Sequence, residues 1–308
     1  MKNVITVRKL VKQYGKLTAV KGVSFEVRRG EIFGLLGENG AGKTTTLEII
    51  EGLRQATSGE VTVLSDNVHN GCSDNIKNKI GVQLQSSAYY NFLTLKEILE
   101  LFGGFYPKFI PAMALLEMVG LTEKANSLVS NLSGGQRQRF SIVASLVNDP
   151  EIVFLDEPTT GLDPVARRRL WDLITNIKNQ GKTIILTTHY MEEAEMLCDR
   201  IAIMDQGKIL ALGETHKLIE QTKTPFHINF VLTEPDPEIT NKLKVYGKVA
   251  NLAHKSNHFE VRLKNQANLN KAIRLIDKLD PESLTVGRAT LEDLFIELTG
   301  HDLGEGNV

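Results

Sequence analysis

The sequence has no hydrophobic run that is long enough to cross a membrane. Its most apolar stretches, Ser141–Val147 and Ile152–Leu155, are far shorter than the about 20 residues that a spanning helix needs. The N-terminal segment MKNVITVRKL lacks the apolar core and the cleavage site of a secretory signal. We therefore expect a cytoplasmic protein and, if it acts at a membrane, another chain that provides the membrane-spanning part.

Cysteine and net charge are also scarce. The two cysteines, Cys72 and Cys198, are far apart and match no metal-binding spacing, which favours reduced thiols in the cytoplasm. A formal net charge of −1 gives no electrostatic reason to expect a nucleic-acid partner. The chain is 42% hydrophobic and 24% charged, as is usual for folded proteins, and its 308 residues allow one large and one small domain.

Strand and helix patterns alternate over the first two thirds of the chain. Ile32–Leu36, Ile152–Leu155 and Thr183–Thr187 are continuous apolar runs, which is typical of strands buried on both faces. Thr44–Leu53 has Leu47, Ile50 and Leu53 at helical spacing. This alternation predicts an α/β fold in which helices cover a mostly parallel sheet.

Two regions depart from that pattern. Residues 86–150 have helical spacing and contain Pro107 and Pro111, which predicts a helical insertion. Residues 226–308 contain several short strand patterns and two amphipathic helical patterns. We therefore predict a main domain over residues 1–222 and a small C-terminal α+β domain over residues 226–308. Its role is either to stabilise a dimer or to regulate.

A glycine-rich loop follows the first buried strand and precedes a helix. It has the full pattern G-x-x-x-x-G-K-[ST], in which backbone N–H groups cradle phosphates at a helix N-terminus. Lys43 is expected to reach the β- and γ-phosphates, and Thr44 to bind Mg²⁺. The predicted nucleotide-binding residues of this loop are Gly37, Glu38, Asn39, Gly40, Ala41, Gly42, Lys43, Thr44 and Thr45.

Two acidic residues end the second buried strand. Asp156 follows Ile152–Leu155 directly and is expected to face the metal, and Glu157 is placed to polarise a water for attack on the γ-phosphate. Two acids after an apolar run are more often a strand end that meets solvent. Together with the phosphate loop, they predict an ATP-hydrolysing site.

A short motif indicates which class of phosphate-loop protein this is. In Leu132–Gln136, Ser133 is expected to cap a helix, while Gly134 and Gly135 leave backbone amides open to a second anion. With Gln136, this motif resembles the signature of ATP-binding-cassette (ABC) proteins. The resemblance covers residues 1–220 and implies a P-loop NTPase cassette whose parallel core is joined by an antiparallel β subdomain and the helical insertion.

The resemblance also implies roles for isolated residues. Tyr14 is similar to the aromatic residue that stacks on adenine, with Val20 beside it. Gln85 is similar to the glutamine that, with Thr44 and Asp156, contacts Mg²⁺. His189 resembles the switch histidine that holds the γ-phosphate, so that Lys43, Glu157 and His189 form the catalytic set. The implied cofactors are ATP and Mg²⁺.

In such proteins two cassettes pack head to tail around two ATP molecules. Ser133, Gly134, Gly135 and Gln136 would then act in trans on the partner's ATP. Asp163, in Gly161–Pro164, would contact the other subunit. We expect a homodimer because every motif is intact, with a heterodimer left open.

Two functions compete within the ABC class. A transporter motor is favoured over a soluble ATPase acting on nucleic acid or ribosomes, since the chain has one cassette and too few residues between Gln85 and Ser133 for a long coiled coil. Arg167–Arg169 is the best basic patch, and an exposed helix face explains it equally well.

His189–Glu195 and Ala289–Phe295 resemble bacterial drug, antibiotic and sodium exporter ATPases, which implies an ABC-2-type permease at the inner face of the membrane. The insertion from Thr94 to Ser133 is shorter than usual for that group, which leaves the shape of the permease open.

Overall fold

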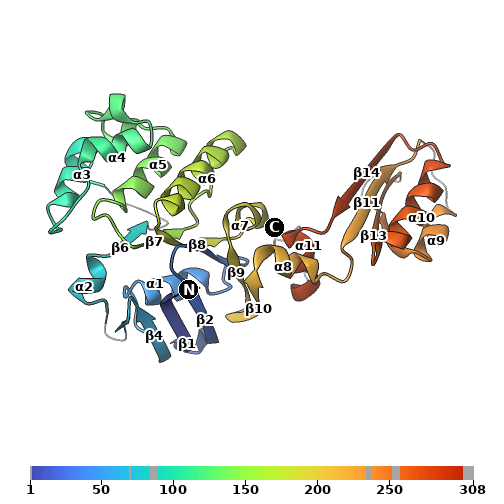
Figure 1. Cartoon of the computed structure of the whole chain (residues 1–308), viewed down its shortest axis with the longest axis horizontal. Helices are drawn as coiled ribbons and strands as arrows, with labels where there is room; N and C mark the ends of the chain where they lie inside the picture. The colour runs from blue at the N-terminus through green and yellow to red at the C-terminus, as the bar shows by residue number, and fades with distance from the viewer. Residues whose placement is uncertain (1, 69–70, 84–88, 234–237, 252–256, 301–308) are drawn as a thin grey trace. The chain divides into compact units, whose positions relative to one another are not determined.

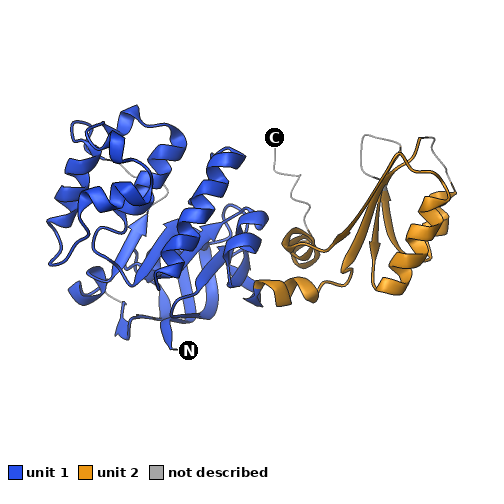
Figure 2. Cartoon of the chain, turned by 45° about the horizontal axis from the view of Figure 1, so that its top comes forward, with its two compact units in different colours: residues 1–214 blue, residues 215–308 orange. Residues whose placement is uncertain are grey.

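The computed structural model describes residues 2–68, 71–83, 89–233, 238–251 and 257–300, and the chain forms two compact units (Figure 2). The first unit comprises Met1–Glu214 and the second comprises Thr215–Val308. The unit boundary therefore precedes residue 226, where the small domain was predicted to begin. Within the described ranges, no helix is long and apolar enough to span a bilayer.

A six-stranded sheet in the order β10-β9-β3-β8-β7-β6 forms the centre of the first unit. All neighbouring strands run parallel except β10, which pairs antiparallel with β9. The three predicted buried strands are present here. The bounds are β3 Ile32–Leu36, β6 Ile80–Gln83, β7 Ile152–Asp156, β8 Thr183–Thr188, β9 Arg200–Asp205 and β10 Lys208–Glu214.

A second, antiparallel sheet in the order β2-β1-β4-β5 packs in the same unit. Its strands are β1 Asn3–Tyr14, β2 Leu17–Arg28, β4 Ser58–Val63 and β5 Asp66–Asn67. Helix α1, Lys43–Ile50, contacts strands of both sheets, and residues from all three share one apolar core. Strands β4, β5, β9 and β10 are not among the predicted elements. The alternating, half-buried pattern of antiparallel strands explains this for β4 and β10, whereas Ile201–Met204 of β9 form a fully buried run that was not recognised.

The remaining helices of the first unit follow from capping and spacing. Thr94 and Ser133 both form capping boxes, which fix where α3 and α5 begin. In Figure 1, α3, α4 and α5 lie together beside β6 and β7, in the region predicted to be a helical insertion. The bounds are α2 Asp74–Lys77, α3 Leu95–Gly103, α4 Ala112–Met118, η1 Thr122–Lys124, η2 Val129–Asn131, α5 Gly134–Ala144, α6 Pro164–Asn179 and α7 Met191–Leu197.

Two helical predictions need correction. The helix predicted over Thr44–Leu53 ends at Ile50, because Gly52 adopts a positive φ of 74°, and Leu53 is 62% exposed. Met113 was predicted to share an apolar face with Leu116 and Val119 but is 41% exposed. Since α4 begins after Pro111, its buried face is formed by residues 112, 115 and 116.

The second unit is a small α+β fold of its own (Figure 2). Its antiparallel sheet has the order β12-β13-β11-β14. Helices α9 and α10 pack against this sheet, and the sheet and the two helices together form one apolar core. Ile228, Phe230 and Val261 alternate along this buried face. The elements are α8 Thr215–Glu220, β11 Phe226–Val231, α9 Ile239–Lys244, β12 Gly247–Asn251, β13 His258–Leu263, α10 Gln266–Asp277, β14 Ser283–Arg288 and α11 Leu291–Thr299.

Candidate functional site

The glycine-rich loop joins the end of β3 to the start of α1. Gly42 is the N-cap of α1 with a φ of 98°, and a Cβ atom built there would lie 2.6 Å from the carbonyl oxygen of Ala19. Only glycine fits this position. The N–H of Gly37 donates to the carbonyl oxygen of Thr188 at 3.3 Å, which joins the loop to β8. The loop thus presents a helix N-terminus of at least two turns for phosphate binding.

Lys43 lies under this loop and is 4% exposed. Its Nζ donates to the carbonyl oxygens of Gly37 at 2.8 Å and Glu38 at 3.0 Å, and lies 3.6 Å from Oε1 of Glu157. Burial lowers the pKa of Lys43, and the nearby carboxylates of Glu157 and Asp156 oppose that shift. The sequence therefore places a buried cation where a bound triphosphate would be held.

Asp156 is the last residue of β7. Its Oδ1 accepts hydrogen bonds from Oγ1 of Thr44, at 3.2 Å, and from Oγ1 of Thr187. Burial raises the pKa of Asp156, and these two hydrogen bonds act in the opposite direction.

The pair formed by Thr44 and Asp156 fits a magnesium ion. One hydroxyl and one carboxylate offer hard oxygen ligands side by side, and Mg²⁺ takes its remaining ligands from phosphates and water. No group of three His, Cys, Asp or Glu residues among the described positions could hold a metal. The donor set therefore fits a phosphate-bound Mg²⁺ rather than a metal held by protein alone.

Glu157 has a backbone conformation that is rare for residues other than glycine. Its φ is 47°, and its N–H donates to Oγ1 of Thr187 at 3.0 Å. Its Oε2 accepts from Oγ1 of Thr160 at 3.2 Å and lies 3.3 Å from Nδ1 of His189. Left-handed backbone at such a residue costs about 1–3 kcal/mol and persists where the surroundings fix it. The strand end thereby turns the carboxylate toward Lys43 and His189.

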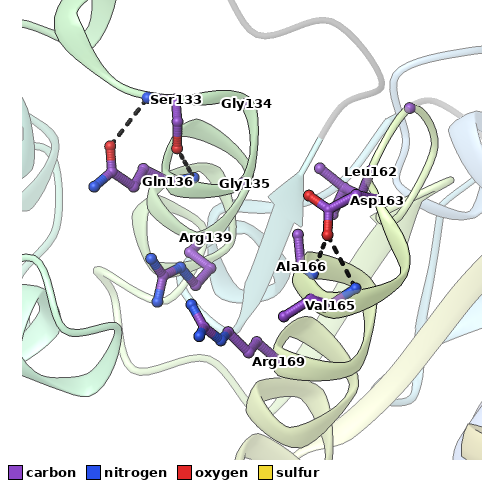
Figure 3. Close-up of a pocket in the computed structure, with 11 residues that line it drawn as sticks. Ser133, Gly134, Gly135, Gln136, Arg139, Leu162, Asp163, Val165, Ala166 and Arg169 are labelled. Atoms are coloured by element: carbon purple, nitrogen blue, oxygen red, sulfur yellow. Dashed lines mark hydrogen bonds between the residues drawn. The ribbon is translucent and has the colours of Figure 1, made fainter.

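A second pocket lies at the start of α5 (Figure 3). The side chain of Ser133 accepts from the N–H of Gln136 at 3.3 Å, and Oε1 of Gln136 accepts from the N–H of Ser133 at 3.0 Å. Across the pocket, Asp163 caps α6 by accepting from the N–H groups of Val165 and Ala166, each at 2.9 Å. Gly134 and Gly135 also line the pocket, so the predicted signature and the predicted dimer-contact loop face one cavity.

Two arginines complete this pocket: Arg139, which sequence reasoning missed, and Arg169, which belongs to the predicted basic patch. Figure 3 shows Arg139 and Arg169 side by side below the signature. Burial and the neighbouring charge of Arg169 lower the pKa of Arg139. In the described ranges neither guanidinium has an ion-pair partner, so the pocket favours an anion. No motif marked Arg139, because arginines on amphipathic helices are usually solvated.

The predicted site residues thus fall into two groups within one chain. Lys43, Thr44, Asp156, Glu157 and His189 converge at the ends of β3, β7 and β8. The signature residues and Asp163 line a different pocket to which none of those five contributes.

The other residues predicted to bind ATP differ in their exposure to solvent. The ring of Tyr14 is 37% exposed, with Nζ of Lys12 5.0 Å and Cζ of Arg54 5.3 Å from its centroid. The side chain of Val20 is fully buried in the core. Glu38, Asn39 and Gly40 are exposed, Ala41 is buried and Thr45 is half-buried. Gln85 lies outside the described residues.

Comparison with known proteins identifies the family. Residues 20–160 match the family model described as ABC transporter. The chain is 35% identical to a Nod factor export ATP-binding protein I of Burkholderia orbicola, over 97% of this chain and 98% of that protein. It is 36% identical to the linearmycin resistance ATP-binding protein LnrL of Bacillus subtilis, over 95% and 97%. The chain belongs to the ATP-binding subunits of ABC transporters.

Solved structures agree with that assignment. The ADP conformation of MJ1267, an ATP-binding cassette of an ABC transporter, matches with a TM-score of 0.64 at 25% identity, over 70% of this chain and 93% of that one. A dimeric post-hydrolysis structure of the cassette MJ0796, bound to ADP and Pi, matches with a TM-score of 0.61 at 27% identity, over 68% and 98%. The predicted P-loop ABC cassette and its ATPase activity are confirmed for this ABC subunit, and the nucleic-acid or ribosome alternative is not favoured.

Proposed function

We propose that this ABC subunit is the motor of an exporter and that it hydrolyses ATP as a head-to-tail homodimer below an ABC-2-type permease. The observation that carries the proposal is the separation of the two half-sites. Glu157 lies beside Lys43 and His189, whereas the signature residues from Ser133 to Gln136 face another pocket. A second copy of the chain is needed to bring the two halves onto one ATP.

Residues of the first half-site would bind and cleave the nucleotide in cis. The loop from Gly37 to Thr45 holds the phosphates, with Lys43 against the β- and γ-phosphates, and Tyr14 faces the adenine. Thr44 and Asp156 would hold Mg²⁺, with Gln85 as a further predicted ligand. When bound, Mg²⁺ neutralises charge on the β- and γ-phosphate oxygens.

Glu157 is the proposed general base. Its carboxylate accepts a proton from the water that attacks the γ-phosphorus, and the bond from that phosphorus to the leaving oxygen of ADP breaks. His189, whose Nδ1 lies 3.3 Å from the same carboxylate, would contact the transferred phosphoryl group. Their fixed positions limit the reorganisation that the reaction requires.

The second half-site would act in trans on the partner's ATP. The N-terminus of α5, which has eleven residues, and the two arginines make the signature pocket attractive to phosphate. Asp163 lies on the opposite wall and is placed to contact the partner cassette. Closure of the dimer upon ATP binding and its release after hydrolysis would drive the permease.

The names of the similar proteins support a role in export, and so does the large share of their length that aligns with this chain. Proteins named for Nod factor export and for linearmycin resistance align over 95% or more of this chain, which includes its C-terminal unit. We infer the same arrangement here, with the subunit peripheral on the cytoplasmic face of the cell membrane. The C-terminal unit then stabilises the homodimer.

A groove beside the helical insertion supports a membrane partner. It is lined by the aromatic side chains of Tyr89, Phe102, Phe105 and Tyr106 and by Leu53. Phe105 is 73% and Leu53 62% exposed, which is costly for large apolar side chains that have no partner. We infer that a cytoplasmic segment of the permease packs there.

Co-purification tests the proposal. The subunit is tagged in its host, membranes are solubilised gently, and co-purifying proteins are identified by mass spectrometry. Recovery of one polytopic membrane protein, lost when Phe105 and Leu53 are replaced by serine, is expected. Recovery of ribosomes or nucleic acid alone would contradict the export function and leave the ATPase activity standing.

A further inference from the structure

Glu193 is a completely buried acidic residue that the proposed chemistry does not use. It lies in α7, which begins two residues after His189, and its exposed fraction is 0%. Burying a carboxyl group is costly unless other groups hydrogen-bond to it. An apolar side chain of similar size would usually stabilise such a position at least as well. The groups that surround Glu193 therefore indicate what it does.

Three segments of the cassette meet at this carboxyl group. Nε1 of Trp171, in α6, donates to Oε1 of Glu193 at 3.3 Å. The hydroxyls of Thr188, at the end of β8, and of Thr159, in the loop after β7, are close enough to lower its pKa, although burial has the larger effect and raises it. Arg167, one turn before Trp171 in α6, is the nearby charge.

Each of these segments carries a residue of the proposed ATP site. Thr188 immediately precedes His189, and its carbonyl oxygen accepts from the N–H of Gly37 in the phosphate loop. The loop that contains Thr159 runs from Glu157 to Asp163, which caps α6. One carboxyl group thus lies between the cis residues and the loop proposed to touch the partner.

The hydrogen bonding around Glu193 is incomplete. Among the described residues, neither Oε2 of Glu193 nor Oγ1 of Thr159 has a hydrogen-bond partner, and both atoms are buried. Thr159 is 0% exposed. A buried polar atom without a partner destabilises the arrangement that contains it. The hydroxyl of Thr159 is nonetheless close enough to Glu193 to lower its pKa, so the loop after β7 lies next to the carboxyl group.

We propose that Glu193 is a positioning residue that couples the loop after β7, residues 158–163, to His189. Because Asp163 at the end of this loop is the predicted contact with the partner cassette, that contact would set the position of the switch histidine. Movement of the loop toward the carboxyl group completes the hydrogen bond to Thr159, and Thr188 transmits the position of Glu193 to His189. The inference rests on the proposed roles of His189 and Asp163.

Steady-state ATPase measurements on the full chain test this coupling. Three variants are compared. Glu193→Met has a side chain of similar length that cannot form hydrogen bonds, and Glu193→Gln keeps part of the hydrogen bonding. Thr159→Val removes only the hydroxyl. We expect Glu193→Met and Thr159→Val to lower kcat about tenfold or more, with KM for ATP changed less than about threefold. Glu193→Gln should recover at least about half of the activity.

Two controls separate positioning from folding. Glu192, in the same helix, is largely exposed, and Glu192→Gln should keep kcat within about twofold of the unchanged protein. Melting temperatures are measured for all variants, because Glu193→Met leaves Nε1 of Trp171 without its acceptor and some loss of stability is expected. If Glu193→Met does not fold, Thr159→Val decides the question alone.

The outcomes also separate this inference from the proposed function. The reference is an unchanged protein that hydrolyses ATP and a Glu157→Gln variant that does not. Against that reference, a wild-type kcat in Glu193→Met would overturn the coupling. If Glu193→Met does not fold, a wild-type kcat in Thr159→Val would overturn it. An equal loss of kcat and of thermal stability in all three variants would also overturn it. Absence of ATP hydrolysis in the unchanged protein would contradict the proposed function itself.

Discussion

Oε1 of Glu157 lies 3.6 Å from Nζ of Lys43, and both side chains are almost completely buried. The carboxylate belongs to the end of β7 and the ammonium to the start of α1, so the parallel sheet holds the base and the phosphate-binding cation together. Breaking a buried ion pair by removing one partner leaves an uncompensated charge. An isosteric substitution of Glu157 keeps the shape of the site but still removes one charge of this pair, so its stability has to be measured together with its activity.

Glu157→Gln should bind ATP but hydrolyse it at least about 100-fold more slowly, because the amide cannot accept the proton of the attacking water. Phosphate release measures the rate, and equilibrium binding of a fluorescent ATP analogue measures affinity. Light scattering should show that ATP converts this variant to a dimer. Phosphate release near the rate of the unchanged protein would refute the role of Glu157 as base.

Gly42→Ala should destabilise the first unit more than Gly40→Ala does. Both glycines have positive φ, 98° and 85°, so alanine is strained by about 1 kcal/mol at either position. Only at Gly42 would the added Cβ also meet a backbone oxygen, at 2.6 Å, whereas nothing lies within 4 Å at Gly40. Urea unfolding followed by the fluorescence of Trp171, the only tryptophan, should show at least about 1 kcal/mol between the two variants. Equal stabilities would contradict the close packing of the loop against Ala19.

Much of the cassette follows from local sequence signals. The apolar runs that became β3, β7 and β8 are long enough to identify buried strands, and the glycine positions of the phosphate loop are set by local backbone geometry. The positions of Asp156 and Glu157 then follow, because the carboxyl ends of parallel strands meet at one edge of the sheet.

Residues that act through tertiary contacts could not be predicted in the same way. Thr187 lies within a predicted strand, yet nothing in its neighbours indicates that its hydroxyl donates to Asp156. The signature pocket joins α5 to α6, and Arg139 and Arg169 become neighbours only when these helices pack. Of the three consecutive arginines, Arg168 and Arg169 are exposed, as a solvated face predicts, whereas Arg167 is half-buried over the ring of Tyr190 at 4.5 Å.

Removing either arginine of the signature pocket should weaken ATP-dependent dimerisation. In the Glu157→Gln background, Arg139→Met and Arg169→Met should each raise the dimer dissociation constant about tenfold or more, as expected for loss of a charge-assisted contact. Arg168→Met is the matched control, because Arg168 is exposed and does not line the pocket. Sedimentation at several protein concentrations measures the constants. Dimerisation as strong as in the control would exclude these guanidinium groups from the trans site.

The stability of the first unit should depend on the protonation of Glu51. This residue is the C-cap of α1 and is 4% exposed, and its Oε1 has no hydrogen-bond partner in the described part of the chain. Burial, with smaller effects from the charges of Asp156 and Glu48, raises the pKa of Glu51 from its ordinary value of 4.5 to about 8. The folded protein therefore keeps a proton that the unfolded chain loses.

Because the folded state binds more protons, the contribution of Glu51 to the free energy of unfolding falls as the pH rises from 4.5 to about 8. The slope for one proton is at most about 1.4 kcal/mol per pH unit, and it vanishes below and above this window. Glu51→Gln replaces the neutral acid by a neutral amide, so this slope should disappear. The variant should match the unchanged protein near pH 5 and exceed its stability by at least about 2 kcal/mol near pH 8. Glu117→Gln, an exposed acid in α4, is the control. Parallel pH profiles of Glu51→Gln and the unchanged protein, measured by urea unfolding with Trp171 fluorescence, would show that Glu51 is ionised in the folded state.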